Sequence, residues 1–144
     1  MKNTSIPIIL VLALLWSCEK ESTKSEEPDI VGTWEAQTET QYWGSISNPD
    51  STDVTTYGSL ATMTWTIESD HDFSSLIYVL GISFTMEGTW TTSGNQLTLN
   101  YTVMGIDVTE VYTYEVESDE LTITGSLDPA DEEGDWVVIV FARQ

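Results

Sequence analysis

The sequence predicts an all-β domain in which an antiparallel meander of about eight strands closes into a barrel. Three observations support this prediction. Apolar and polar residues alternate along most of the chain after residue 30, which is the pattern of strands with one buried face. Threonine fills many of the polar positions, and its branched β-carbon suits a pleated sheet. Short groups of Gly, Asn, Asp and Ser separate the runs, and no stretch combines a helical period with capping residues.

The alternation also sets the expected strands and their connections. In residues 61–67 the positions alternate between Thr and an apolar residue, and residues 96–103 follow a similar pattern. We expect eight or nine short strands, at residues 31–40, 53–58, 61–69, 74–80, 82–92, 96–103, 108–117, 120–126 and 136–142. Tight turns between neighbours favour a meander, and closing it into a barrel removes the exposed strand edges. A β-sandwich with the same strand count is the alternative.

The segment from residue 41 to residue 59 is the least strand-like part of the domain. It contains Asn48-Pro49-Asp50, and its only strand-like run is 53–58. We interpret it as a long loop over one end of the barrel. Long loops often carry binding residues. Tyr42, Trp43 and Tyr57 are therefore candidates for exposed aromatic side chains.

The N-terminus has the features of a secretory signal. Lys2 supplies a positive charge, residues 6–16 form an apolar run, and the small Ser17 precedes Cys18. The apolar run is too short to span a bilayer, which takes about 20 residues. We expect a signal peptide at residues 1–17 and a flexible polar tether at residues 18–29. Residues 30–144 then form a single domain.

Leu15-Trp16-Ser17-Cys18 resembles the lipobox of bacterial lipoproteins, although Trp16 is bulky for its position. The resemblance implies that Cys18 is cleaved to become the first residue and carries the acyl chains that anchor the protein in the outer membrane. The Glu-Lys-Glu that follows Cys18 resembles an acidic surface-export tag of Gram-negative lipoproteins, which implies a domain facing the cell exterior. A domain facing the periplasm is the alternative, and an ordinary signal peptide with an incidental cysteine is a further one.

The charge of the chain excludes one class of partner. The formal net charge is −20, and residues 30–144 contain nineteen acidic residues and a single cation, Arg143. Nucleic-acid binding needs clusters of Lys and Arg, so we expect no nucleic-acid partner. An anionic membrane surface would also repel this domain. We therefore expect the lipid on Cys18 to hold the protein at the membrane.

Two Gly-Thr-Trp tripeptides occur, at residues 32–34 and 88–90. The first resembles the Gly-x-Trp signature of the first lipocalin strand. The resemblance implies that Trp34 packs across the closed end of the barrel beneath an arginine from the last strand. Arg143 holds that position, so Gly32, Trp34 and Arg143 are expected to close the barrel as structural residues. The wider pattern, including Leu-Thr-Ile-Thr at 121–124, resembles the lipocalin-like domains of bacterial lipoproteins.

A barrel of about eight strands is either filled by side chains or holds a small ligand. The lipocalin resemblance implies a small apolar or amphipathic ligand in the barrel or at its mouth. The alternative is an interaction module with a filled barrel that acts through its loops or in a complex with a protein whose nature the sequence does not indicate. The candidate ligand-binding residues are the large inward positions Met63, Trp65, Leu99, Tyr101, Tyr112 and Tyr114.

The sequence offers no catalytic constellation. His71 stands alone in an acidic turn, Cys18 is expected to carry lipid, and residues 30–144 contain no lysine. We expect a protein that is not an enzyme and needs no cofactor. The acidic loop at 128–135 could supply oxygen ligands to calcium, although its spacing differs from that of an EF-hand and a solvated loop is the simpler interpretation. Its candidate ligands are Asp128, Asp131, Glu133 and Asp135.

Overall fold

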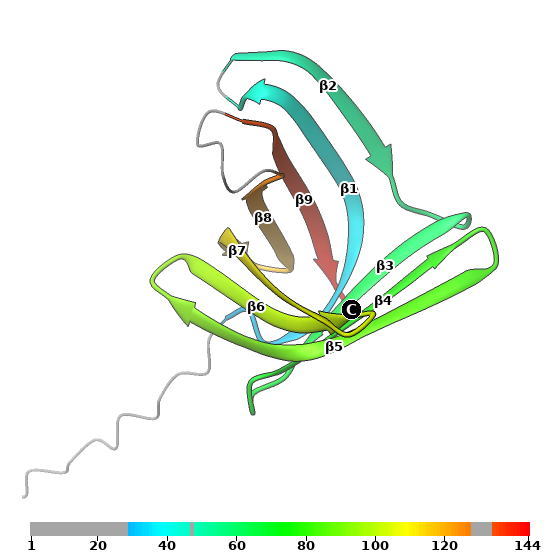
Figure 1. Cartoon of the computed structure of the whole chain (residues 1–144), viewed down its shortest axis with the longest axis vertical. Coiled ribbons are helices and arrows are strands. Elements are labelled where there is room, and N and C mark those ends of the chain that lie inside the picture. Colours follow the sequence, from blue (N-terminus) through cyan, green and yellow to red (C-terminus); the bar gives the residue numbers. More distant parts are fainter. Residues whose placement is uncertain (1–28, 47, 128–133) are drawn as a thin grey trace, which may run out of the picture.

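The computed structural model describes residues 29–46, 48–127 and 134–144 (Figure 1). The expected signal peptide, Cys18 and the tether up to residue 28 lie outside these residues. Among the described residues, none belongs to a helix long and apolar enough to cross a membrane. The regular elements of this part are nine strands: β1 (Gly32–Ser45), β2 (Asn48–Thr56), β3 (Ala61–Ile67), β4 (Asp72–Val79), β5 (Ile82–Ser93), β6 (Gln96–Val103), β7 (Ile106–Glu117), β8 (Glu120–Ser126) and β9 (Trp136–Arg143).

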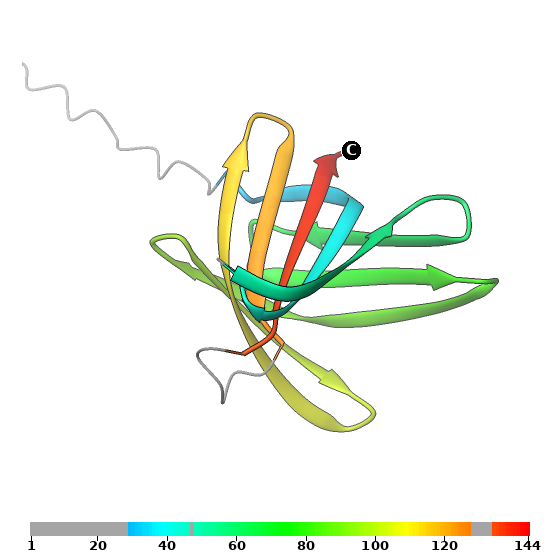
Figure 2. The ribbon, with the colours of Figure 1, turned by 90° about the horizontal axis from the view of Figure 1, so that it is seen from above.

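The strands form one antiparallel sheet that closes on itself. From β3 to β9 each strand pairs with the next one in the sequence, and β1 pairs with both β3 and β9. These eight strands make the barrel, and β2 is an added strand beside β1 (Figures 1 and 2). The predicted meander and its closure into a barrel are confirmed, and the pairing of β1 with β9 excludes the sandwich.

The predicted long loop between residues 41 and 59 is wrong. β1 runs on to Ser45, and β2 returns antiparallel along it from Asn48. On this edge of β1 the first four residues pair with β3 and the residues from Thr38 onward pair with β2. The strand predicted at 53–58 therefore overlaps only the last four residues of β2. Residues 51–56 are exposed on both faces, so no alternation of buried positions marks the full strand in the sequence.

The core fills one end of the barrel, which we call the closed end. Trp34, Trp90 and Phe141 are its largest fully buried side chains. Trp65 extends the core toward the other end, with its ring centroid 5.3 Å from that of Phe73 and 4.8 Å from that of Phe141. Burying each of these large side chains contributes about 1.5–3 kcal/mol. This end of the barrel is therefore the rigid base of the fold.

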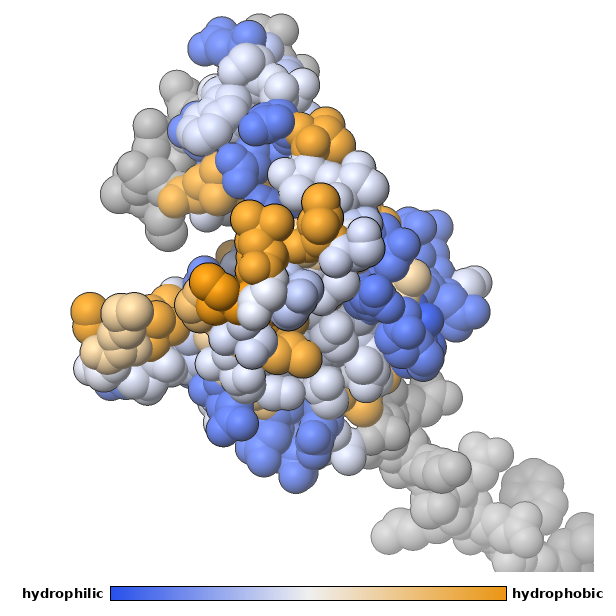
Figure 3. All heavy atoms as spheres, turned by 90° about the vertical axis from the view of Figure 1, so that its right-hand side faces the viewer, coloured by the Kyte–Doolittle hydropathy of each residue, from blue (hydrophilic) through white to orange (hydrophobic). Residues whose placement is uncertain are grey.

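The opposite end of the barrel, which we call the open end, is not fully closed by strand pairing. β7 pairs with β6 from Ile106 to Thr113, but its pairing with β8 begins only at Thr113. Among the residues that the structure describes, the first half of β7 therefore has no strand paired with it on its β8 side. The two parts of the sheet, β2-β1-β9-β8 and β3 to β7, diverge at this end (Figure 1). A space-filling view shows a hollow between them, bordered by apolar atoms (Figure 3).

Two hairpins project beyond the open end (Figure 2). Their two-residue turns are Leu80-Gly81, between β4 and β5, and Met104-Gly105, between β6 and β7. All four residues have positive φ angles, as a type I′ turn requires. Asn and Gly favour these positions, whereas Leu80 and Met104 are apolar and are 75% and 98% exposed.

Candidate ligand-binding site

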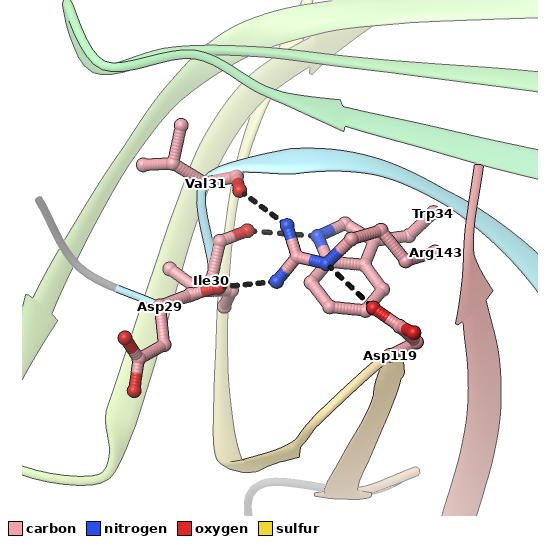
Figure 4. Close-up of polar contacts among 6 residues, drawn as sticks. All are labelled: Asp29, Ile30, Val31, Trp34, Asp119 and Arg143. Atoms are coloured by element: carbon pink, nitrogen blue, oxygen red, sulfur yellow. Dashed lines mark hydrogen bonds and ion pairs between the residues drawn. The ribbon is translucent and has the colours of Figure 1, made fainter.

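The closed end of the barrel is held by Arg143 and Trp34 (Figure 4). The guanidinium carbon of Arg143 lies 4.1 Å from the centroid of the Trp34 ring. Arg143 Nη1 donates to the carbonyl oxygen of Val31 at 3.0 Å, and its Nη2 donates to that of Asp29 at 2.9 Å. The indole Nε1 of Trp34 donates to the carbonyl of Ile30 at 2.8 Å. The cation therefore fastens the chain that enters the barrel to the strand that ends it.

Gly32 makes this arrangement possible. Its φ angle is +150°, and a Cβ built on it would lie 2.7 Å from Nη1 of Arg143. A side chain at this position would strain the backbone and displace the guanidinium. The structure thus brings Gly32, Trp34 and Arg143 together at the closed end, where they contact one another, the backbone and the side chain of Asp119. Trp34 is fully buried, so this group leaves no room for a ligand.

A β-bulge in β1 decides which residues face the interior above this core. The register of β1 against β9 shifts between Ala36 and Thr38, so that Gln37 is an extra residue. Before the bulge Trp34 and Ala36 face inward, and after it Glu39 lies opposite the buried Ile139. Directly opposed residues of an antiparallel pair share a face. The bulge therefore turns an acidic side chain into the barrel.

Glu39 belongs to a group of five side chains that we call the acid–tyrosine cluster: Glu39, Tyr57, Tyr101, Glu110 and Tyr112. The hydroxyl of Tyr57 donates to Oε2 of Glu39 at 2.6 Å, and that of Tyr112 donates to Oε2 of Glu110 at 2.8 Å. Tyr101 also hydrogen-bonds to Glu110. Glu110 faces inward because it lies opposite the buried Leu99. The cluster thus joins side chains from β1, β6 and β7 with Tyr57, which follows β2.

The environment of the cluster stabilises the protonated form of its tyrosines. Burial, followed by the hydrogen bond to Glu39 and its charge, raises the pKa of Tyr57 well above its usual value. Burial and the interaction with Glu110 raise the pKa of Tyr101 in the same way. For Tyr112 burial is again the largest cause of the raised pKa, followed by the charge of Glu110, and the charge of Glu39 adds to it. The charges of Glu39 and Glu110 therefore both raise the pKa of Tyr112, although the two residues come from strands that are not neighbours.

Two glycines give the cluster tyrosines room. A Cβ on Gly125 of β8 would lie 2.5 Å from the Tyr112 ring. A Cβ on Gly88 of β5 would collide with the carbonyl oxygen of Asn100 and lie 2.8 Å from the Cβ of Tyr101. The Tyr112 ring therefore occupies the space of a side chain at position 125, whereas Gly88 allows the close approach of the β6 backbone at Asn100 and Tyr101. Tyr57 was predicted to be an exposed aromatic, but it is half-buried because it packs against the core and bonds to Glu39.

The interior wall across from β1 is apolar and open. Ile77 of β4 lies opposite both the buried Met63 and Phe84, so Phe84 also faces inward. Val79 and Ile82 form the next inward pair along this hairpin. Phe84 and Ile82 are nevertheless 56% and 59% exposed. These side chains therefore give the inner face of the projecting β4–β5 hairpin an apolar surface that is accessible at the open end.

The six predicted ligand residues divide between the core and the open interior. Met63, Trp65 and Leu99 are buried in the core, whereas Tyr101, Tyr112 and Tyr114 are half-buried and pack against it. Only Tyr101 and Tyr112 belong to the acid–tyrosine cluster. Sequence reasoning did not find Glu39, Tyr57 and Glu110 as a group. The alternation of 108–117 places Glu110 on the tyrosine face, but the bulge that turns Glu39 inward has no sequence signal.

The interior also holds a buried hydroxyl without a partner. Ser75 of β4 is fully buried, and its Oγ makes no hydrogen bond to the described residues. It lies opposite Trp65, so it faces the interior. The ring centroid of Trp65 is in turn 6.1 Å from that of Tyr112. Ser75 is therefore a neighbour, through Trp65, of the acid–tyrosine cluster.

The predicted calcium loop lies mostly outside the described residues, which include only Asp135 of its four candidate ligands. Oδ1 of Asp135 accepts a hydrogen bond from the backbone nitrogen of Gly44 at 2.8 Å. Within the described ranges, no three His, Cys, Asp or Glu side chains are grouped so that they could hold a metal ion. His71 is exposed in its turn, as its acidic surroundings predict, and its ring stacks on Trp90 at 5.2 Å.

The outer surface of the barrel offers a second kind of concavity. A hollow of about 420 Å³ is lined by side chains that include Glu68, Asp72 and Glu87. A second hollow, of about 360 Å³, includes Glu87 and Asp107. Both lie over the sheet among acidic residues and threonine or serine. The second hollow is also lined by Tyr101 and Val108, but neither hollow is lined by the exposed apolar pair Ile82 and Phe84.

The chain matches no model of a protein family and no sequence among curated proteins. The geometry of the barrel is therefore what indicates a site at the open end.

Proposed function

We propose that this protein is a lipoprotein, anchored in the outer membrane through Cys18 and facing the cell exterior, whose barrel binds a small amphipathic molecule at its open end. The observation that carries the proposal is the exposure of inward-facing apolar side chains, above all Ile82 and Phe84. These side chains offer an apolar surface that a ligand can reach. The acid–tyrosine cluster beside them supplies polar contacts, and a few polar groups in an apolar cavity are typical of small-molecule sites.

Binding is tested with dodecanol, a neutral molecule with one apolar chain. Residues 19–144 contain every strand of the barrel, so they are the protein to use. We expect dodecanol to change the tryptophan fluorescence in a saturable manner, because Trp65 contacts Tyr112 at the site. Phe84→Asp, which places a charge on the inner wall, should abolish the change, whereas Thr85→Asp on the outer face should preserve it. Absence of any saturable change in the unmodified domain would overturn the proposed function.

Anchoring is tested separately, on the full chain in a Gram-negative host. Cys18→Ala should release the protein from the membrane fraction, because the acidic domain has no other attraction to an anionic surface. Protease added to intact cells should digest the anchored protein if the domain faces outward, and should leave it intact if the domain faces the periplasm. Retention of Cys18→Ala in the membrane would contradict the lipid anchor.

A second candidate function is supported by the hairpin tips. Leu80 and Met104 are apolar and highly exposed at turns that favour Asn and Gly. Such tips are suited to contact with another protein, as the interaction-module alternative requires. The two functions differ in one respect: Leu80→Asn with Met104→Asn should leave dodecanol binding intact if the barrel interior is the site.

A further inference from the structure

The chemistry of the open interior narrows the class of ligand. We propose that the bound molecule carries a cationic head group on an apolar body, with the head at the acid–tyrosine cluster and the body along the wall of β4 and β5. This inference rests on the proposed function, because it concerns the same site. It excludes a fatty-acid carboxylate as the preferred ligand.

The first support is uncompensated negative charge. Glu39 and Glu110 face inward from β1 and β7, and the charges of both reach Tyr112. Arg143 is the single Lys or Arg of residues 30–144, and it is engaged at the closed end. Acidic side chains on one inner wall create a negative potential that favours a cation over an anion. A ligand cation at the cluster would be attracted by both carboxylates.

The second support is the aromatic composition of the cluster. Three tyrosine rings surround the two carboxylates, and their hydroxyls donate to Glu39 and Glu110 rather than to a ligand anion. Rings of this kind attract ammonium groups through their faces, by more when the cation is desolvated. The cluster therefore offers a cation both carboxylate oxygens and aromatic faces. Its tyrosine hydroxyls are engaged by the carboxylates, and the amide of Gln41 beside it also donates to Glu39, at 2.8 Å.

The apolar wall supports an amphipathic ligand independently of the acidic residues. Val79, Ile82 and Phe84 face the interior and are exposed, so they provide a surface for an apolar body next to the cluster. An exposed apolar surface beside a group of polar side chains is typical of small-molecule sites.

The test compares three probes that share one chain: dodecyltrimethylammonium, dodecanol and dodecanoate. Titration calorimetry on residues 19–144, below the critical micelle concentration of each probe, gives the three dissociation constants. We expect the ammonium probe to bind at least about tenfold more tightly than dodecanoate, as a favourable contact with two carboxylates requires. Dodecanol should lie between them.

Two double variants test whether the carboxylates of the cluster cause the preference for the ammonium probe. The double variant Glu39→Gln with Glu110→Gln keeps acceptors for the tyrosine hydroxyls but removes both charges, and it should reduce the tenfold preference to less than about threefold. The matched control, Glu115→Gln with Glu117→Gln, removes two charges from the outer face of the same strand β7 and should preserve the preference. Unchanged dodecanol binding shows that each variant is folded.

Each outcome is decisive. Dodecanol binding without an ammonium preference, or a preference lost equally in the outer-face control, overturns the cationic head group and leaves the proposed function standing. If none of the three probes binds, the proposed function falls and this inference falls with it. An ammonium preference that disappears only in the Glu39→Gln, Glu110→Gln variant supports both the proposed function and the cationic head group.

Discussion

At the scale of single residues, Arg143 joins the last strand to the chain that enters the barrel. It covers the Trp34 ring and donates hydrogen bonds to two carbonyls of the entering chain. Its ion pair with Asp119 is long, at 3.8 Å, and Asp119 is exposed. The stabilising part of this group is therefore the stacking and the bonds to the backbone, since exposed ion pairs contribute little.

Replacing Arg143 by Met should lower the free energy of unfolding by about 2 kcal/mol, because the cation–π contact and two hydrogen bonds are lost together. Urea denaturation followed by tryptophan fluorescence measures the change. Asp119→Asn is the control and should cost less than about 0.5 kcal/mol. Equal effects of the two substitutions would show that the ion pair, and not the stacking, holds the closed end.

The cluster tyrosines predict a loss of stability at alkaline pH. Their pKa values are raised in the folded protein, so above pH about 10 the unfolded chain loses protons that the folded protein keeps. The stability is thus fully present below that pH and falls as the pH rises further. Denaturant titrations between pH 9 and pH 11 should show this fall, and Tyr112→Phe should make it shallower. An identical slope in Tyr112→Phe would contradict the raised pKa of Tyr112.

At the scale of elements, Gly125 of β8 leaves the space that the Tyr112 ring of the cluster occupies. Gly125→Ala places a methyl group against the Tyr112 ring and should destabilise the fold by about 1–3 kcal/mol. Gly58→Ala is the matched control, because a Cβ on Gly58 meets no atom within 4 Å. Thermal melts of the two variants should therefore differ clearly. A Gly125→Ala melt equal to that of the control would mean that Tyr112 does not occupy this space.

Substitutions at the hairpin tips are expected to stabilise the fold. Leu80 and Met104 have left-handed backbone conformations that favour Asn over apolar residues. Leu80→Asn and Met104→Asn should each raise the free energy of unfolding, by about 0.5–1 kcal/mol. Denaturant midpoints provide the measurement, with Thr85→Asn on a neighbouring exposed strand position as a control that should not stabilise. A loss of stability in both tip variants would show that the apolar side chains have packing partners in solution.

The sequence predicts best the strands whose alternating apolar side chains are buried in the core. The strands at 96–103 and 120–126 were predicted with the bounds that the structure has, because each alternates buried and exposed positions. β2 was predicted only in part, by the strand expected at 53–58, because both of its faces are exposed and its full length is defined by its pairing with β1. The bulge at Gln37 reverses the inward face of β1, and a one-residue shift of this kind is a property of the paired strands.

At the scale of the whole molecule, the barrel has two ends of different character. The closed end is packed with aromatic side chains and held by the domain's single cation. The open end combines an apolar wall with two carboxylates and three tyrosines. The candidate ligand residues predicted from the sequence fell partly into the core, because alternation identifies the inner face but cannot tell at which height the barrel stops being filled.

This division of the barrel is tested most directly by amide NMR of isotope-labelled residues 19–144 titrated with dodecanol. Binding at the open end predicts shifts at Tyr57, Phe84 and Tyr112, with Trp34 and Trp90 at the closed end unmoved. Shifts confined to the closed end, or no shifts at saturating dodecanol, would contradict a ligand site in the open interior.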